Sequence, residues 1–144
     1  MGNYIKKYNP PFNNSVPVAN IDVSNLADWT NVMDFDLDEG KGVYQVWFNL
    51  GGAYSHAGAF DNHWIEVRIY DDVADAVVAG TNRYLIPIEN LAPNGDLFYR
   101  NCSINFTIRT TQDTTLRLQA ISHSITTGAV IDKDHTNFGF VKIA

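Results

Sequence analysis

The chain has 144 residues, a net charge of −6, 45% hydrophobic residues and 18% charged residues. This length predicts one domain, which can bury about two-thirds of the surface that its unfolded form exposes, and the hydrophobic content excludes disorder over most of the chain. The ten Lys and Arg residues are scattered and no apolar run approaches the ~20 residues of a membrane span, so we expect neither a nucleic-acid partner nor membrane insertion. The low share of charged residues indicates that part of the surface faces another protein.

Residues 1–25 are predicted to form an extended arm, because they contain three prolines and several asparagines and lack helical periodicity. Lys6 and Lys7 are not followed by an apolar segment, so we expect neither a signal peptide nor a membrane anchor. An arm of this kind suits attachment to another protein, and a first edge strand near residues 16–21 is the alternative. Residues 26–144 are predicted to form the folded domain.

Hydrophobic periodicity predicts strands along the rest of the chain. Between Val32 and Asp38, apolar residues alternate with acidic ones, which is typical of a half-buried strand. Residues 42–50 are apolar on both faces, and a glycine-rich loop is predicted at residues 51–62. We expect the last strand to pair with residues 42–50, because an apolar chain end is tolerated when it is tied into a sheet. Further strands are predicted at residues 64–70, 76–79, 83–88, 102–109, 114–121 and 137–144.

About eight to ten short strands without an amphipathic helix predict an all-β protein, either a sandwich or a jelly roll. Residues 42–48 read Gly-Val-Tyr-Gln-Val-Trp-Phe, residues 111–119 turn into a leucine-alternating strand, and residues 137–141 read Asn-Phe-Gly-Phe-Val. In this order and over roughly residues 30–144, these stretches resemble the jelly-roll domain shared by the globular heads of the first complement component and the tumour necrosis factor superfamily.

The resemblance implies a jelly-roll β-sandwich of antiparallel strands that assembles as a homotrimer, with aromatic strands meeting around a three-fold axis. The chain has one cysteine and no collagen-like stem, which favours the similar domains of phage and other viral particles, or of bacterial surfaces. The residue pattern supports an interface independently of the resemblance. Some strands carry apolar residues on both faces, and one face is enough to fill the core, so the other is available for a contact between copies. The candidates for the trimer interface are Val43, Trp47, Tyr70 and Val141.

The glycine-rich loop and the start of the next strand are predicted to bind a receptor or a glycan. They place aromatic and imidazole side chains among small residues, which suits stacking on sugar rings or docking into a protein groove. The alternative is that the loop packs on a neighbouring copy in the trimer. The candidate binding residues are Tyr54, His56, Phe60, His63 and Trp64.

No catalytic residue and no metal site is predicted. Residues 34–40 have the alternating acids of a calcium loop without its glycine and glutamate spacing, so we expect no cofactor; surface calcium at Asp71, Asp72 and Asp75 is the alternative. The four histidines lack the spacing of a zinc site, and there is no nucleophile elbow or phosphate-binding loop. Cys102 alternates with apolar residues, which indicates a buried small side chain and not a reactive thiol.

These expectations combine into one hypothesis of function. On the resemblance, we expect the chain to be a non-enzymatic structural protein of a virion surface, of a phage in particular, that decorates a capsid or forms a fibre or spike tip. Its arm attaches to capsid or tail proteins, and its loops bind a host-surface receptor or glycan. A purely architectural, capsid-stabilising protein is one alternative, and a carbohydrate-binding module or small glycan hydrolase is another. An extracellular or bacterial cell-surface location is the alternative to the virion.

Overall fold

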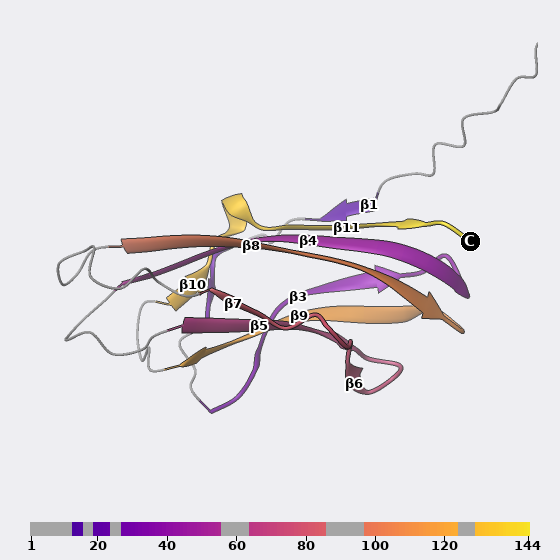
Figure 1. Cartoon of the computed structure of the whole chain (residues 1–144), viewed down its shortest axis with the longest axis horizontal. Helices are drawn as coiled ribbons and strands as arrows, with labels where there is room; N and C mark the ends of the chain where they lie inside the picture. The colour runs from indigo at the N-terminus through magenta and orange to yellow at the C-terminus, as the bar shows by residue number, and fades with distance from the viewer. Residues whose placement is uncertain (1–12, 16–18, 24–26, 56–63, 86–96, 124–128) are drawn as a thin grey trace, which may run out of the picture.

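The chain is an antiparallel β-sandwich of two sheets, seen edge-on in Figure 1. Its computed structural model describes residues 13–15, 19–23, 27–55, 64–85, 97–123 and 129–144. Every strand pair within this part of the chain is antiparallel. The prediction of an all-β sandwich is therefore confirmed.

Sheet A, the upper layer in Figure 1, is built around the long strand β4. β4 pairs with β8 on one side and with β11 and β10 on the other, while β1 extends the sheet beyond β11 and β2 extends it beyond β10. The predicted pairing of the last strand with residues 42–50 is confirmed by the register from Asn137 opposite Asn49 to Lys142 opposite Tyr44. The strands of sheet A are β1 (Asn13–Ser15), β2 (Ile21–Asp22), β4 (Gly42–Ser55), β8 (Leu97–Thr110), β10 (Ala129–Ile131) and β11 (Asn137–Lys142).

Sheet B, the lower layer, has the order β3-β9-β5, with β6 and β7 both pairing with β5. A single turn of 3-10 helix, η1 (Lys133–His135), joins β10 to β11 on the side of sheet A. Among the described residues, no helix has the length and apolar character that crossing a membrane requires. The strands of sheet B are β3 (Thr30–Leu37), β5 (Trp64–Asp71), β6 (Ala76–Val77), β7 (Arg83–Leu85) and β9 (Thr114–His123).

Two boundaries differ from the sequence prediction. β4 and β8 each have 14 residues, because their register continues without interruption from Gly42 opposite Thr110 to Ser55 opposite Leu97. The loop predicted to begin at residue 51 was therefore wrong for residues 51–55, which are strand. β1 and β2 lie within the predicted arm and pair with β11 and β10, so these parts of residues 1–25 belong to sheet A.

The core lies between the two sheets and is formed by the side chains that alternate inward. Phe35 of β3 meets Phe140 of β11 edge to face, with ring centroids 5.1 Å apart, and Phe138 packs against Phe35 as well. All three rings are buried. Burying a phenylalanine side chain contributes about 1.5–3 kcal/mol, so this contact between β3 and the last strand is a main link between the layers.

Candidate functional site

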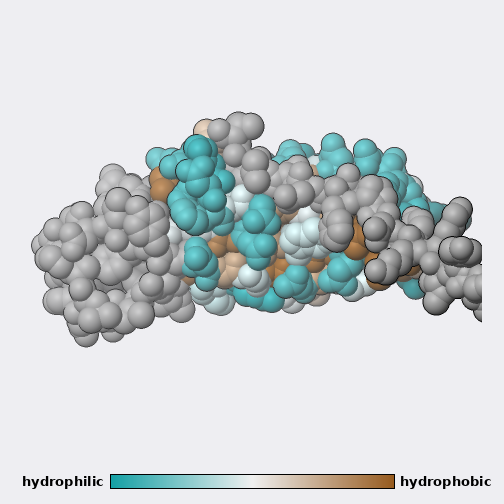
Figure 2. Space-filling view, turned by 90° about the horizontal axis from the view of Figure 1, so that it is seen from above, coloured by the Kyte–Doolittle hydropathy of each residue, from teal (hydrophilic) through white to brown (hydrophobic). Residues whose placement is uncertain are grey.

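The three strands β4, β8 and β11 of sheet A turn few charged side chains away from the core, and those of sheet B turn more. Among the described side chains that β4, β8 and β11 turn away from the core, Arg109 alone is charged. The outward surface of sheet B carries Asp34, Glu66 and Arg117, among other charged groups. Figure 2 looks onto sheet A, where hydrophilic and hydrophobic residues are interspersed. We call this surface face A; it consists of Val43, Gln45, Trp47, Asn49, Gly51, Asn101, Ser103, Asn105, Thr107, Arg109, Asn137, Gly139 and Val141.

Uncharged polar side chains bond one another across the strands of face A. Asn49 of β4 donates to Asn137 Oδ1 of β11 at 3.1 Å and accepts from Ser103 Oγ of β8 at 2.9 Å. Further along β4, Gln45 accepts from Thr107 Oγ1 at 2.9 Å. These residues are direct cross-strand partners, so the register of the sheet positions the hydrogen bonds. Apart from Arg109, the polar groups of face A are therefore uncharged, and burying them costs less than burying ions.

Three of the four predicted interface residues lie together on face A. Val43 and Trp47 are half-buried on β4, and Val141 lies on β11 opposite Gln45, between them. Tyr70 does not join this group, because it lies on β5 in the other sheet, opposite Arg117. Its hydroxyl group donates a hydrogen bond to the Asp75 carboxylate. The four residues predicted for one surface therefore occupy the outer sides of two different sheets.

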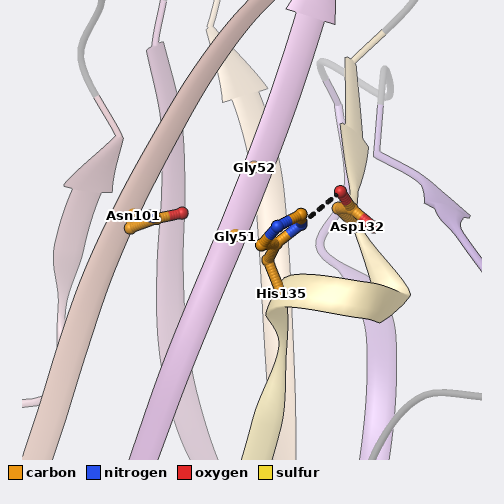
Figure 3. Close-up of a pocket in the computed structure, with 5 residues that line it drawn as sticks. All are labelled: Gly51, Gly52, Asn101, Asp132 and His135. Atoms are coloured by element: carbon orange, nitrogen blue, oxygen red, sulfur yellow. Dashed lines mark hydrogen bonds and ion pairs between the residues drawn. The ribbon is translucent and has the colours of Figure 1, made fainter.

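A hollow opens on face A where β4 has no side chain. It has a volume of about 260 Å³ and is lined by Gly51 and Gly52 of β4, Asn101 of β8, and Asp132 and His135 of the turn that contains η1. In Figure 3, Asn101 points toward Gly51 from one side and His135 lies on the other side. A Cβ at position 51 would stand 2.4 Å from His135 Cβ and 3.4 Å from Asn101 Oδ1, so glycine is what allows the two side chains to approach.

The turn that forms one wall of the hollow is fixed to β4 by hydrogen bonds. The Asp132 amide donates to the Gly51 carbonyl at 2.8 Å, and Thr136 Oγ1 accepts from the Gly51 amide at 3.1 Å. Within the turn, the Asp132 carboxylate accepts from the Asp134 amide at 2.9 Å and lies 2.8 Å from His135 Nδ1. These contacts, first the Asp134 amide and then His135, lower the pKa of Asp132. A charged carboxylate therefore orients the imidazole beside the hollow.

The predicted receptor-binding residues have different placements. Tyr54 belongs to β4, where it lies opposite Phe98 and Ala129, while His56, Phe60 and His63 lie outside the described residues. Trp64 begins β5 on the outer side of sheet B and stacks on the His123 ring, with centroids 4.6 Å apart. His123 Nε2 in turn lies 3.0 Å from Glu66 Oε2. Sequence reasoning missed His123 and Glu66, which the pairing of β5 with β9 brings to Trp64.

The acidic residues considered for calcium have other partners. Asp72 pairs with Arg117 at 2.8 Å, Asp71 accepts hydrogen bonds from the Val73 and Ala74 amides, and Asp75 accepts one from Tyr70. In the part of the chain that the structure describes, no group of three or more His, Cys, Asp or Glu side chains is placed to hold a metal ion.

Neither a protein-family model nor a curated protein sequence matches this chain. The resemblance to the complement and tumour necrosis factor jelly rolls therefore stays a prediction. The function proposed below therefore rests on the order of the strands and on the side chains of face A.

Proposed function

We propose that this chain is a non-enzymatic structural protein that assembles as a homotrimer through the part of face A that carries Val43, Trp47 and Val141. The observation that carries the proposal is the low charge of face A, on which Arg109 is the one charged side chain and Val43, Trp47 and Val141 lie together, whereas the outer side of sheet B carries several charged groups. Charged residues are depleted from the centres of protein interfaces and aromatic residues are enriched, because ions cost more to desolvate than amides and hydroxyls. Face A shares the low charge of such centres, and its one aromatic side chain, Trp47, lies near Val43 and Val141.

The order of the strands supports the jelly-roll part of the proposal. If β1, β3, β4, β5, β7, β8, β9 and β11 are numbered one to eight along the chain, sheet A has the order 1-8-3-6 and sheet B the order 2-7-4-5. In this arrangement the two sheets share interleaved Greek-key connections, which is the pattern of an eight-stranded jelly roll. The first and last strands, β1 and β11, are neighbours in sheet A, so both ends of the domain lie next to the proposed interface.

The resemblance implies three copies. In a cyclic trimer every copy uses the same contact surface, so the surface around Val43, Trp47 and Val141 is covered in each copy. An obligate interface of this type buries roughly 2,000 Å² or more. On the same resemblance we place the trimer on the exterior of a virion, as capsid decoration or as a fibre or spike tip that meets the host surface. The N-terminal arm attaches it to capsid or tail proteins.

The mass of the protein in solution tests the proposed assembly. We expect analytical ultracentrifugation at micromolar concentration to give about 48 kDa, three times the chain mass of 16.1 kDa. Val141→Asp places an unpaired charge on face A and is expected to give folded monomers, because an ion in an interface loses its hydration. Val73→Asp is the matched control, since Val73 is 49% exposed and lies away from face A. A wild-type monomer, or a Val141→Asp variant that remains trimeric, would contradict the proposal.

A further inference from the structure

We propose that the hollow at Gly51 is a binding site for a neutral saccharide, with Asn101 and His135 as the residues that contact the sugar. The proposal rests on the surface-binding role proposed above and gives that role a site. The site differs from the predicted loop, because its residues come from β8 and from the turn before β11.

The size of the hollow limits the ligand to a small group. Its volume of about 260 Å³ lies just below the range of ~300–1,000 Å³ for pockets that enclose a drug-sized molecule. A hollow of this volume suits one sugar ring, either free or at the end of a longer glycan. The walls are held in place, because Gly51 bonds both Asp132 and Thr136 through its backbone.

The groups around the hollow match a hydroxylated ligand. Two residues before Gly51 on β4, the Asn49 side chain forms hydrogen bonds with both Asn137 and Ser103. The cross-strand partner of Asn101 is Gly51, which offers no side chain. An amide has donors and acceptors in one planar group, as a sugar with adjacent hydroxyl groups requires. His135 is 63% exposed at its side chain and is held through Nδ1 by Asp132, so its other ring nitrogen is available to a hydroxyl group.

The charge beside the hollow favours a neutral ligand over an anion. Asp132 is ionised at neutral pH, since its contacts lower its pKa, and it would repel a phosphate, sulfate or sialic acid. The nearby Lys133 does not offset this, because its ammonium group pairs with Asp134 at 2.5 Å. A saccharide without a formal charge avoids the repulsion.

The hollow and the proposed trimer contact occupy different parts of face A. On β4, Gly51 lies eight residues from Val43 and four from Trp47, which corresponds to about 26 Å and about 13 Å at ~3.3 Å per residue. Val141 lies near the Val43 end, opposite Gln45. A trimer formed through that end presents three hollows, and multivalent binding can raise the affinity of a weak site by about 10² to 10⁴.

A glycan array probed with the wild-type protein, followed by saturation-transfer NMR with free neutral hexoses and N-acetylhexosamines, tests the site. We expect Asn101→Ala and His135→Ala to weaken binding at least tenfold, and Asn101→Phe, which fills the hollow from an exposed position, to abolish it. His123→Ala and Asn31→Ala are matched controls on sheet B and are expected to bind as wild type does. Gly51→Ala is unsuitable, because its Cβ would collide with His135 and move the turn.

The outcomes separate this site from the proposed assembly when ultracentrifugation is done on the same samples. Unchanged binding by the Asn101 and His135 variants, or loss of binding in His123→Ala, would overturn the site while a trimeric mass kept the proposed assembly. Saccharide binding by a wild-type monomer would overturn the assembly and keep the site. A preference for sialylated or phosphorylated glycans, or no saccharide binding in either assay, would overturn the assignment of a neutral sugar.

Discussion

The indole ring of Trp47 covers Gly139 so closely that a Cβ at position 139 would stand 2.3 Å from ring atom Cζ2. The two residues are cross-strand partners in β4 and β11. A glycine at this position is therefore needed for the ring to lie against the last strand. The contact fixes the largest side chain of face A on the surface that we propose as the trimer interface.

Gly139→Ala is expected to destabilise the protein by about 1–3 kcal/mol, because the added methyl group must displace the indole. In a Trp47→Ala background the same substitution is expected to cost far less, since the ring is absent. Urea unfolding of the four proteins at one protomer concentration measures the coupling, which we expect at about 0.5–3 kcal/mol. Additive effects of the two substitutions would show that the ring does not require the glycine.

Phe138→Ala is expected to destabilise the protein by about 3–5 kcal/mol, because it removes a buried ring that packs on Phe35 of the opposite sheet. Val73→Ala, at an exposed position, is the control and is expected to change stability by less than about 0.5 kcal/mol. Urea or thermal unfolding checks both variants. A loss below about 1 kcal/mol for Phe138→Ala would mean that the last strand does not hold the layers together.

Periodicity was enough to predict much of the fold. The alternation before Gly40 gave β3, the runs at residues 64–70 and 114–121 gave β5 and β9, and the apolar last strand led to its pairing with β4. In each case one face is buried and the other is not, so the side-chain pattern follows the burial directly. Parity also predicted that Tyr70 and Trp47 point away from the core. It could not place them on different sheets, because alternation along a strand separates inward from outward side chains but does not tell which of the two sheets the strand belongs to.

The hollow at Gly51 could not be predicted from sequence. Two adjacent glycines are typical of a loop, and residues 51–62 were interpreted as one. In the structure each glycine is required by a distant side chain: a Cβ at Gly51 would meet His135, and a Cβ at Gly52 would stand 2.7 Å from Leu85 Cδ1. Such tertiary contacts leave no periodic signal. The sequence holds one indication of the site. Gly51 follows Trp47 and Asn49 in steps of two, so a continued strand would place it on the same outward face.

The stability of the protein is expected to fall with decreasing pH partly through Asp132. The folded state lowers the pKa of this carboxyl group through the Asp134 amide and His135. A depressed folded-state pKa stabilises the protein above the unfolded-state pKa of about 3.9, and this stabilisation is lost as the pH falls through the folded-state value. Urea unfolding from pH 6 down to pH 2 measures the dependence. Asp132→Asn should give a shallower slope below pH 4, and an identical slope would show that Asp132 does not contribute.

The thiol of Cys102 is expected to react slowly with Ellman's reagent in the folded protein. Burial raises its pKa to about 11, and the opposing effect of Arg83 is smaller. At pH 8 the thiolate fraction is then about 0.1%, against roughly a quarter for an unperturbed thiol with a pKa of ~8.5, which predicts labelling about 200-fold slower than in urea. Val73→Cys, at a position that is 49% exposed and lies away from face A, is the matched control when Cys102 is replaced by Ser. Fast labelling of folded wild-type protein would mean that the thiol is not shielded by the core residues against which it packs.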